Sequence, residues 1–236
     1  MFKNSQEKEL EPTFACSQVW GTWWDEPIMR SRVLDAFERI AILILFTSFL
    51  NALVGSIISS WQRGQSFVIG DFMLLITESM MVVLVLSRRK ATQLSLLPMD
   101  WALAFSATCL SLLARPCPGA PQFWHSLAAL LTIVGLSTQL YSKLTLGRRF
   151  GLVAANRGIC SSGPYRFVRH PIYLGYVMLH LGFFLLNPTF WNLCVFATLY
   201  IIKIPRILAE ERLLVQDPDY RQYMEKVRSR LIPGLF

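Results

Sequence analysis

The amino-acid sequence predicts an all-α fold, a polytopic membrane helical bundle of about six spans with a cytoplasmic helical segment at its C-terminal end. Three observations predict it. Of the 236 residues, 53% are hydrophobic and only 16% are charged, whereas a soluble domain has about 25% charged residues. The apolar residues form runs long enough to cross a bilayer as helices. The basic residues lie between these runs, mostly in alternate loops.

Composition also argues against other classes of protein. A net charge of +8 would suit nucleic-acid binding, but the basic residues form no stripe with interleaved aromatic residues, so no nucleic-acid partner is expected. The five cysteines show no CxxC and no Cys/His ligand spacing, so no metal site is expected. No signal peptide is expected either, because the first apolar run begins near Ile40, after a charged and aromatic lead.

Residues 1–39 form the first of three predicted regions, a cytoplasmic or interfacial N-terminal lead. Within it Val33, Leu34, Phe37 and Ile40 recur at helical spacing. This pattern favours an interfacial amphipathic helix that leads into the first span. A partly ordered tail is the alternative.

Residues 40–142 are expected to hold four transmembrane helices, and residues 143–236 hold two more. A spanning helix needs about 20 mostly apolar residues to cross roughly 30 Å of hydrocarbon. The candidate spans are Ile40–Ser59, Phe67–Leu86, Pro98–Ala114, Phe123–Tyr141, Pro171–Leu186 and Phe190–Ile204. The last two form a helical hairpin, because only residues 187–189 separate them. The third and fifth runs are the weakest candidates, so five spans is the alternative count.

The basic residues predict the orientation of these spans. Only Arg63 lies between the first two runs, and only Arg115 lies between the third and fourth. The other loops and the tail hold most of the rest: Arg30, Arg32, Arg39, Arg88, Arg89, Lys90, Lys143, Arg148, Arg149, Arg157, Arg166, Arg169, Lys203, Arg206, Arg212, Arg221, Lys226, Arg228 and Arg230. By the positive-inside rule, both termini, the long loop before the fifth span and the tail are cytoplasmic.

Beyond the sixth span, Pro205 predicts a kink followed by a new helix, because proline cannot continue the backbone hydrogen bonding. Within that helix Arg206 and Glu210 share a face, while Glu211 points about 100° away. Residues 217–219, Asp-Pro-Asp, predict a break. A basic amphipathic helix is expected over Tyr220–Arg230.

The start of the fifth span carries the most informative stretch, Gly163–Gly175. Pro171 suits the first turn of a helix, so His170 precedes a helix start, where unpaired N–H groups and the helix dipole favour an anion. The hairpin should return the sixth span to this boundary. We therefore expect one pocket at the membrane–cytoplasm boundary, formed by Arg166, Arg169, His170, Tyr173, Arg206, Glu210 and Glu211. Taken singly, these residues also suit snorkelling anchors and helix caps.

These motifs resemble the isoprenylcysteine carboxyl methyltransferase family of integral membrane methyltransferases. The resemblance covers about residues 143–234. It lies in residues 169–175, Arg-His-Pro-Ile-Tyr-Leu-Gly, in residues 206–211, Arg-Ile-Leu-Ala-Glu-Glu, and in Tyr220, Tyr223, Val227 and residues 231–233, Leu-Ile-Pro. Phospholipid N-methyltransferases, methanethiol S-methyltransferases and some sterol reductases carry related patterns.

The resemblance implies that residues 143–236 are a catalytic region that uses S-adenosylmethionine as methyl donor. It implies the following cofactor-binding residues: Tyr165, Arg169, His170, Pro171, Tyr173, Glu210 and Glu211. One of the two glutamates would pair with the cofactor's ammonium group, and aromatic faces suit its sulfonium. Arg206, facing the acceptor, and Glu210 are the candidate catalytic residues. No Gly-x-Gly-x-x-Gly occurs, so a Rossmann-type methyltransferase is not supported.

The methyl acceptor is expected to be lipophilic or small and to enter from the membrane lipid, most simply as an isoprenylcysteine-like carboxylate. A carboxylate is ionised at neutral pH and needs no base. An amine or a thiol stays open and would give a glutamate or His170 a general-base role. An NADPH-dependent reductase of the sterol-reductase type is an alternative from another enzyme class, and a non-catalytic scaffold or transporter is a third.

Four polar residues lie away from this pocket in the sequence. Glu78 lies deep in the second span with Asp71 on roughly the same face, and intramembrane acids are costly enough to suggest function. An acceptor tunnel and a paired packing contact are equally good interpretations. His180 is expected to be a packed, hydrogen-bonded histidine, and His125 lies near the outer surface.

Overall fold

The computed structural model describes residues 27–62, 69–117, 120–232 and 234. The described chain is mostly helical, as predicted. Its helices are α1 (Pro27–Gln62), α2 (Ile69–Ser87), α3 (Pro98–Ser111), α4 (Phe123–Leu146), α5 (Pro171–Leu186), α6 (Phe190–Leu214) and α7 (Pro218–Lys226). Two 3-10 turns, η1 (Gly147–Arg149) and η2 (Gly163–Arg166), lie between α4 and α5. The short strands β1 (Gln93–Leu94) and β2 (Ala155–Asn156), which were not expected, form an antiparallel pair.

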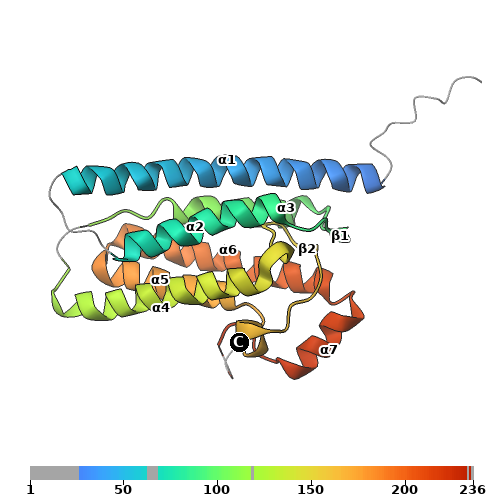
Figure 1. Ribbon diagram of the computed structural model, residues 1–236. Coiled ribbons are helices and arrows are strands. Elements are labelled where there is room, and N and C mark those ends of the chain that lie inside the picture. The colour runs from blue at the N-terminus through green and yellow to red at the C-terminus, as the bar shows by residue number, and fades with distance from the viewer. Residues whose placement is uncertain (1–26, 63–68, 118–119, 233, 235–236) are drawn as a thin grey trace, which may run out of the picture.

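The six long helices run alongside one another, with α1 along one side of the bundle (Figure 1). α4 packs against α5 and α2, α1 packs against α2, and α3 packs against α6. The β1–β2 pair and α7 lie at the same end of the bundle (Figure 1). The basic loops predicted to share one compartment meet at this end, where the Arg89 N–H donates to the Arg148 carbonyl at 2.7 Å.

Three of the described helices are long and apolar enough to cross a membrane: the Arg32–Gln62 part of α1, the segment Phe123–Arg149 that contains α4, and α6. Phe72–Ser87 of α2 and all of α5 are shorter apolar helices. Each of the described α-helices except α7 overlaps one of the predicted spans. The chain is therefore a helical protein suited to a membrane, while the count of six spans stays a prediction.

The amphipathic lead and the first span are one continuous helix, α1, rather than two. Val33, Phe37 and Ile40 lie on its exposed side, and Glu38 on the opposite side is fully buried. The remainder of the predicted lead, residues 1–26, lies outside the described residues.

The C-terminal helices differ from the prediction in two ways. α6 continues through Pro205 to Leu214, so no separate helix begins there. Buried side chains at Lys203, Ile207 and Glu211 follow one face past the proline, so packing holds the helix together where one hydrogen bond is lost. The other difference is that α7 ends at Lys226 instead of Arg230, because residues 229 and 230 pair with the start of α5.

Glycines bring α4 and α5 into close contact. A Cβ added to Gly175 would lie 2.7 Å from the Gly135 carbonyl oxygen and 2.6 Å from Gln139 Cγ, and one on Gly182 would lie 2.8 Å from the Ala128 carbonyl oxygen. Small residues let helix backbones approach closely in membranes. This contact fixes the start of α5 against the end of α4.

Two buried clusters flank the site. One joins α1 and α2 to the loop after η1 through Ile42, Met81, Phe150 and Leu152. The other packs the loop before α5 against α7 and consists of Cys160, Tyr165, Tyr220, Tyr223 and Val227. The connecting loop between α4 and α5 is thus part of the core.

Candidate functional site

A cavity of about 680 Å³ lies inside the bundle. His170, Tyr173, Arg206 and Glu210 line its polar part, where α5 and α6 meet the loop. Apolar residues of α1, of α3 and of the position just after α3 line another part: Leu45, Phe46, Phe49, Ala52, Ala107 and Leu112. The arrangement can hold a polar group at one end and a lipophilic one along the rest.

Glu211 is the centre of an ion cluster at the start of α5. Its Oε1 lies 2.9 Å from Arg169 Nε and 3.2 Å from His170 Nε2, and its Oε2 accepts a hydrogen bond from Arg230 Nε at 2.8 Å. The side-chain Nε–H of Arg169 forms no hydrogen bond with the Glu211 carboxylate, so the contact between the two side chains is an ion pair only. Glu211, Arg169 and His170 are all buried. Protein cations therefore neutralise this carboxylate.

The backbone around His170 is also occupied. The N–H groups of Arg169 and His170 donate to the carbonyls of Ser229 and Arg230 at 3.0 and 2.9 Å, and the Tyr173 N–H donates to the His170 carbonyl. The expectation that these N–H groups are unpaired was therefore wrong at these three positions. The tail, whose pairing was not visible in its sequence, satisfies the N–H groups of Arg169 and His170, and the His170 carbonyl satisfies that of Tyr173.

Glu210 has different surroundings from its neighbour. It is half-buried and lines the cavity. It forms no hydrogen bond or ion pair with any residue that the structure describes. Tyr173, which also lines the cavity, lies with its ring 5.7 Å from that of His170. The two glutamates point in different directions, as predicted. The Glu211 carboxylate is neutralised by protein cations, whereas the Glu210 carboxylate lines the cavity.

Arg206 lies at the cavity wall with Glu210, one turn away on α6. Its Nη2 donates to the Leu152 carbonyl at 2.8 Å, and its guanidinium carbon lies 5.7 Å from the centre of the Tyr173 ring. No acidic side chain in the described chain forms an ion pair with it. Arg206 and Glu210 of α6 line the same cavity as His170, as their sequence positions predict.

Three tyrosines stabilise the loop beside the cavity. The Tyr223 hydroxyl donates to the Tyr165 carbonyl at 2.6 Å. Burial raises the pKa of Tyr165 well above its usual value, and burial also raises the pKa of Tyr220 and Tyr223. These phenols stay protonated at neutral pH, and the Tyr220 hydroxyl donates to Glu211 Oε1 at 3.5 Å. Pro171 is buried at the first position of α5, as its sequence position predicts.

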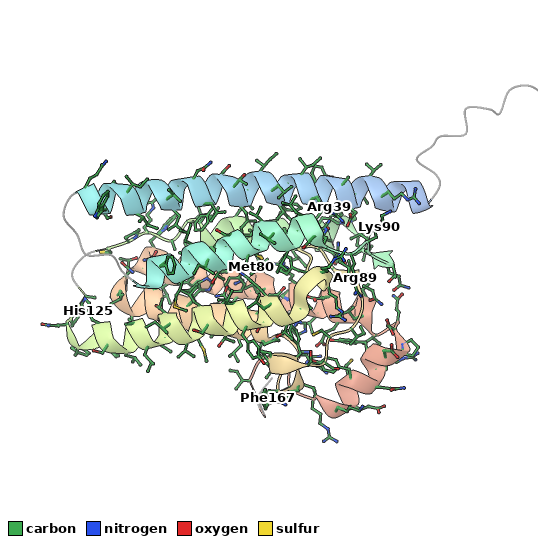
Figure 2. All side chains as sticks on the ribbon, in the orientation of Figure 1. Arg39, Met80, Arg89, Lys90, His125 and Phe167 are labelled. Atoms are coloured by element: carbon green, nitrogen blue, oxygen red, sulfur yellow. The ribbon has the colours of Figure 1, made fainter. Side chains whose placement is uncertain are left out.

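One residue of the expected pocket lies elsewhere. Arg166 is exposed and stacks on Phe167, with its guanidinium carbon 4.9 Å from the ring centre. Phe167 projects from the lower side of the molecule in Figure 2. The prediction that Arg166 joins the pocket was wrong, because η2 turns its side chain to the surface.

Glu78 forms the paired packing contact that was one of its two interpretations, while a role in an acceptor tunnel stays a prediction. It lines the cavity, and its Oε1 lies 3.4 Å from Nζ of Lys143. The Asp71 side chain lies outside the described residues. His180 is buried and bonds to the Tyr200 hydroxyl at 2.9 Å, as expected. His125 is at the opposite end of the bundle from Arg89 (Figure 2).

Sequence reasoning missed two groups of buried charges. Lys203 is 5% exposed and lines the cavity, with its Nζ 4.2 Å from the centre of the Tyr176 ring. Its place within an apolar run was the available signal. The second group, Asp35 and Glu38 with Arg88 and Arg157, joins three distant parts of the sequence. No local pattern indicates those pairings.

Part of the chain matches a known protein family. Residues 128–216, from within α4 to just beyond α6, match the model of the Isoprenylcysteine carboxyl methyltransferase (ICMT) family. The matched region includes the α5 start, Arg206 and both glutamates. No curated protein matches the chain.

Proposed function

We propose that this chain is a membrane methyltransferase that transfers a methyl group from S-adenosylmethionine to a lipophilic or small acceptor. The match of residues 128–216 to the isoprenylcysteine carboxyl methyltransferase family supports this proposal. The acceptor group that the site favours is a carboxylate, as in an isoprenylcysteine-like molecule. The observation that supports the proposal most is the Glu210 carboxylate, which pairs with none of the described residues and lines a cavity that continues into an apolar region.

The residues at the polar end suit the cofactor. Glu210 offers an unneutralised carboxylate to an ammonium group, and the Tyr173 ring offers a face to a sulfonium. Glu211 is occupied by Arg169, His170 and Arg230, so its role is to position the α5 start. When bound, S-adenosylmethionine supplies a methyl group on a positively charged sulfur.

Arg206 orients the acceptor in this proposal. An ionised carboxylate held by its guanidinium needs no proton removed, because one oxygen takes the methyl group and becomes a neutral ester. An amine or thiol acceptor would need a base. His170 is poorly suited to that role, because its Nε2 already lies 3.2 Å from Glu211.

Transfer of labelled methyl from S-adenosylmethionine to prenylcysteines, ethanolamine lipids, thiols and native lipid extract tests the proposal. We expect incorporation into the prenylcysteine as a base-labile methyl ester. Glu210→Gln should weaken S-adenosylmethionine binding at least tenfold, while Glu225→Gln on the exposed side of α7 should leave it unchanged. Binding of NADPH in place of S-adenosylmethionine, or equal binding by both variants, would contradict the proposal.

A further inference from the structure

We propose that Glu38, on α1 and outside the matched family region, is a positioning residue that holds Arg206 at the cavity through the Leu152 peptide. The connection rests on the proposed function only in that Arg206 is taken to orient the acceptor. Each contact in it is a hydrogen bond between residues far apart in the sequence.

The first contact joins α1 to the loop that follows η1. Oε1 of Glu38 accepts hydrogen bonds from the N–H groups of both Leu152 and Val153, at 2.7 and 2.9 Å. One oxygen therefore fixes two successive peptide groups. Glu38 is fully buried, so water cannot replace these bonds without opening the core.

The second contact joins the same loop to α6. The Leu152 carbonyl accepts a hydrogen bond from Arg206 Nη2 at 2.8 Å. Leu152 is thus held by Glu38 through its N–H and holds Arg206 through its carbonyl. A shift of this loop would move the acceptor for the guanidinium, which lies 5.7 Å from the centre of the Tyr173 ring.

Buried arginines make the position of Glu38 stable. Its Oε2 lies 3.1 Å from Nη2 of Arg88 and 3.2 Å from Nη2 of Arg157. The loop folds tightly over this pair, because a Cβ on Gly151 would lie 2.1 Å from Arg157 Nη1. A buried carboxylate with two cations and two backbone donors is fully engaged.

Asp35 provides a matched comparison within the same cluster. Its Oδ1 lies 2.8 Å from Arg88 Nη2 and 3.2 Å from Arg157 Nη2, but its hydrogen bonds include none to the loop backbone. If the cluster only fastened α1 to Arg88 and Arg157, then Glu38 and Asp35, which both contact these two arginines, would affect Arg206 to a similar extent. If the cluster positions Arg206 through the loop, replacing Glu38 should affect Arg206 more than replacing Asp35 does.

The test compares Glu38→Ala, Glu38→Gln and Asp35→Asn in the full-length protein in lipid nanodiscs. Two readouts do not depend on methyl transfer: amide exchange at Leu152 and Val153, and the rate at which phenylglyoxal modifies Arg206. Both should rise at least tenfold in Glu38→Ala and less than threefold in Asp35→Asn. Glu38→Gln, which keeps an oxygen for the two N–H groups, should lie between them.

Methyl transfer supplies the functional readout. Glu38→Ala should lower kcat/KM for the acceptor ten- to hundredfold with S-adenosylmethionine affinity unchanged, because misplacement by about 1 Å can cost that much. In an Arg206→Ala background, Glu38→Ala should lower kcat/KM less than threefold, because its effect passes through Arg206.

Three results would overturn the proposal: equal effects of Glu38→Ala and Asp35→Asn, unchanged exchange and modification in Glu38→Ala, or losses that add in full to Arg206→Ala. A wild-type protein that transfers no methyl group would refute the proposed function instead. In that case the exchange and modification rates still decide whether Glu38 holds Arg206.

Discussion

Glu210 and Glu211 are adjacent in the sequence, yet their surroundings give them separate roles. Glu211 is 4% exposed and contacts Arg169, His170 and Arg230, whereas Glu210 lines the cavity without an ion pair in the described chain. A buried carboxylate whose partners are also buried is a structural requirement, because removing it leaves the partners' charges uncompensated. An unpaired one at a cavity wall is available to a ligand.

Replacing Glu211 by Ala should therefore destabilise the protein by about 3–5 kcal/mol, because Arg169 and His170 would stay buried without their carboxylate. Thermal unfolding in detergent measures this change. Glu210→Ala should change the midpoint little. Similar destabilisation by the two variants would show that the glutamates do not differ in this way.

Gly151 is a position where only the absence of a side chain lets the loop pack against Arg157. Gly151→Ala would place a Cβ 2.1 Å from Arg157 Nη1, so the loop or the arginine must move. We expect a stability loss of about 1–3 kcal/mol, visible as a lower midpoint of thermal unfolding. The matched variant Gly55→Ala, whose Cβ would meet no atom within 4 Å, should not destabilise.

At the scale of elements, the contact between α4 and α5 sets where the α5 start lies. Gly135 and Gly175 face each other across it, and each would bring a Cβ within 2.8 Å of backbone on the other helix. The backbone of a packed helix cannot move aside to avoid a clash as a flexible side chain can. The two helices would have to separate, and His170 and Tyr173 would move with α5.

Gly175→Leu should accordingly reduce both stability and S-adenosylmethionine affinity, since overpacking commonly costs about 1–3 kcal/mol or more. Isothermal titration and thermal unfolding of the purified variant check this. Leu181→Ala, at an exposed position on α5, is the comparison. Unchanged affinity in Gly175→Leu would mean that the helix contact does not position the site.

The extended residues after α7 form the other element that supports the site. Ser229 and Arg230 supply backbone carbonyls to Arg169 and His170, and Arg230 also contacts Glu211. A chain ending at Lys226 loses all of these contacts. It should lose measurable S-adenosylmethionine binding, while a chain ending at Ile232 should keep it.

At the scale of the whole molecule, the basic residues gather at the end that carries the site. Arg39, Arg89 and Lys90 lie there, and His125 lies at the other end (Figure 2). The positive-inside rule predicts that the first end is cytoplasmic. A cofactor made in the cytoplasm would then reach the polar end directly, and a lipophilic acceptor would reach the apolar part from the bilayer.

Single cysteines introduced in a cysteine-free background test this orientation. Lys90→Cys should react with a membrane-impermeant maleimide only after cells are opened, and His125→Cys should react in intact cells. The reverse pattern would place the site on the outer face.

The sequence by itself determined the helical membrane class, the bounds of α5 and the approach of α6 to His170, because hydrophobic length, proline position and charge distribution act locally along the chain. It also separated the faces of Glu210 and Glu211. Tertiary structure decided the rest. The continuation of α6 past Pro205, the pairing of the tail with Arg169 and the burial of Glu38 against Leu152 depend on contacts between distant segments. No local pattern encodes such contacts, since each partner alone resembles an ordinary surface charge or loop.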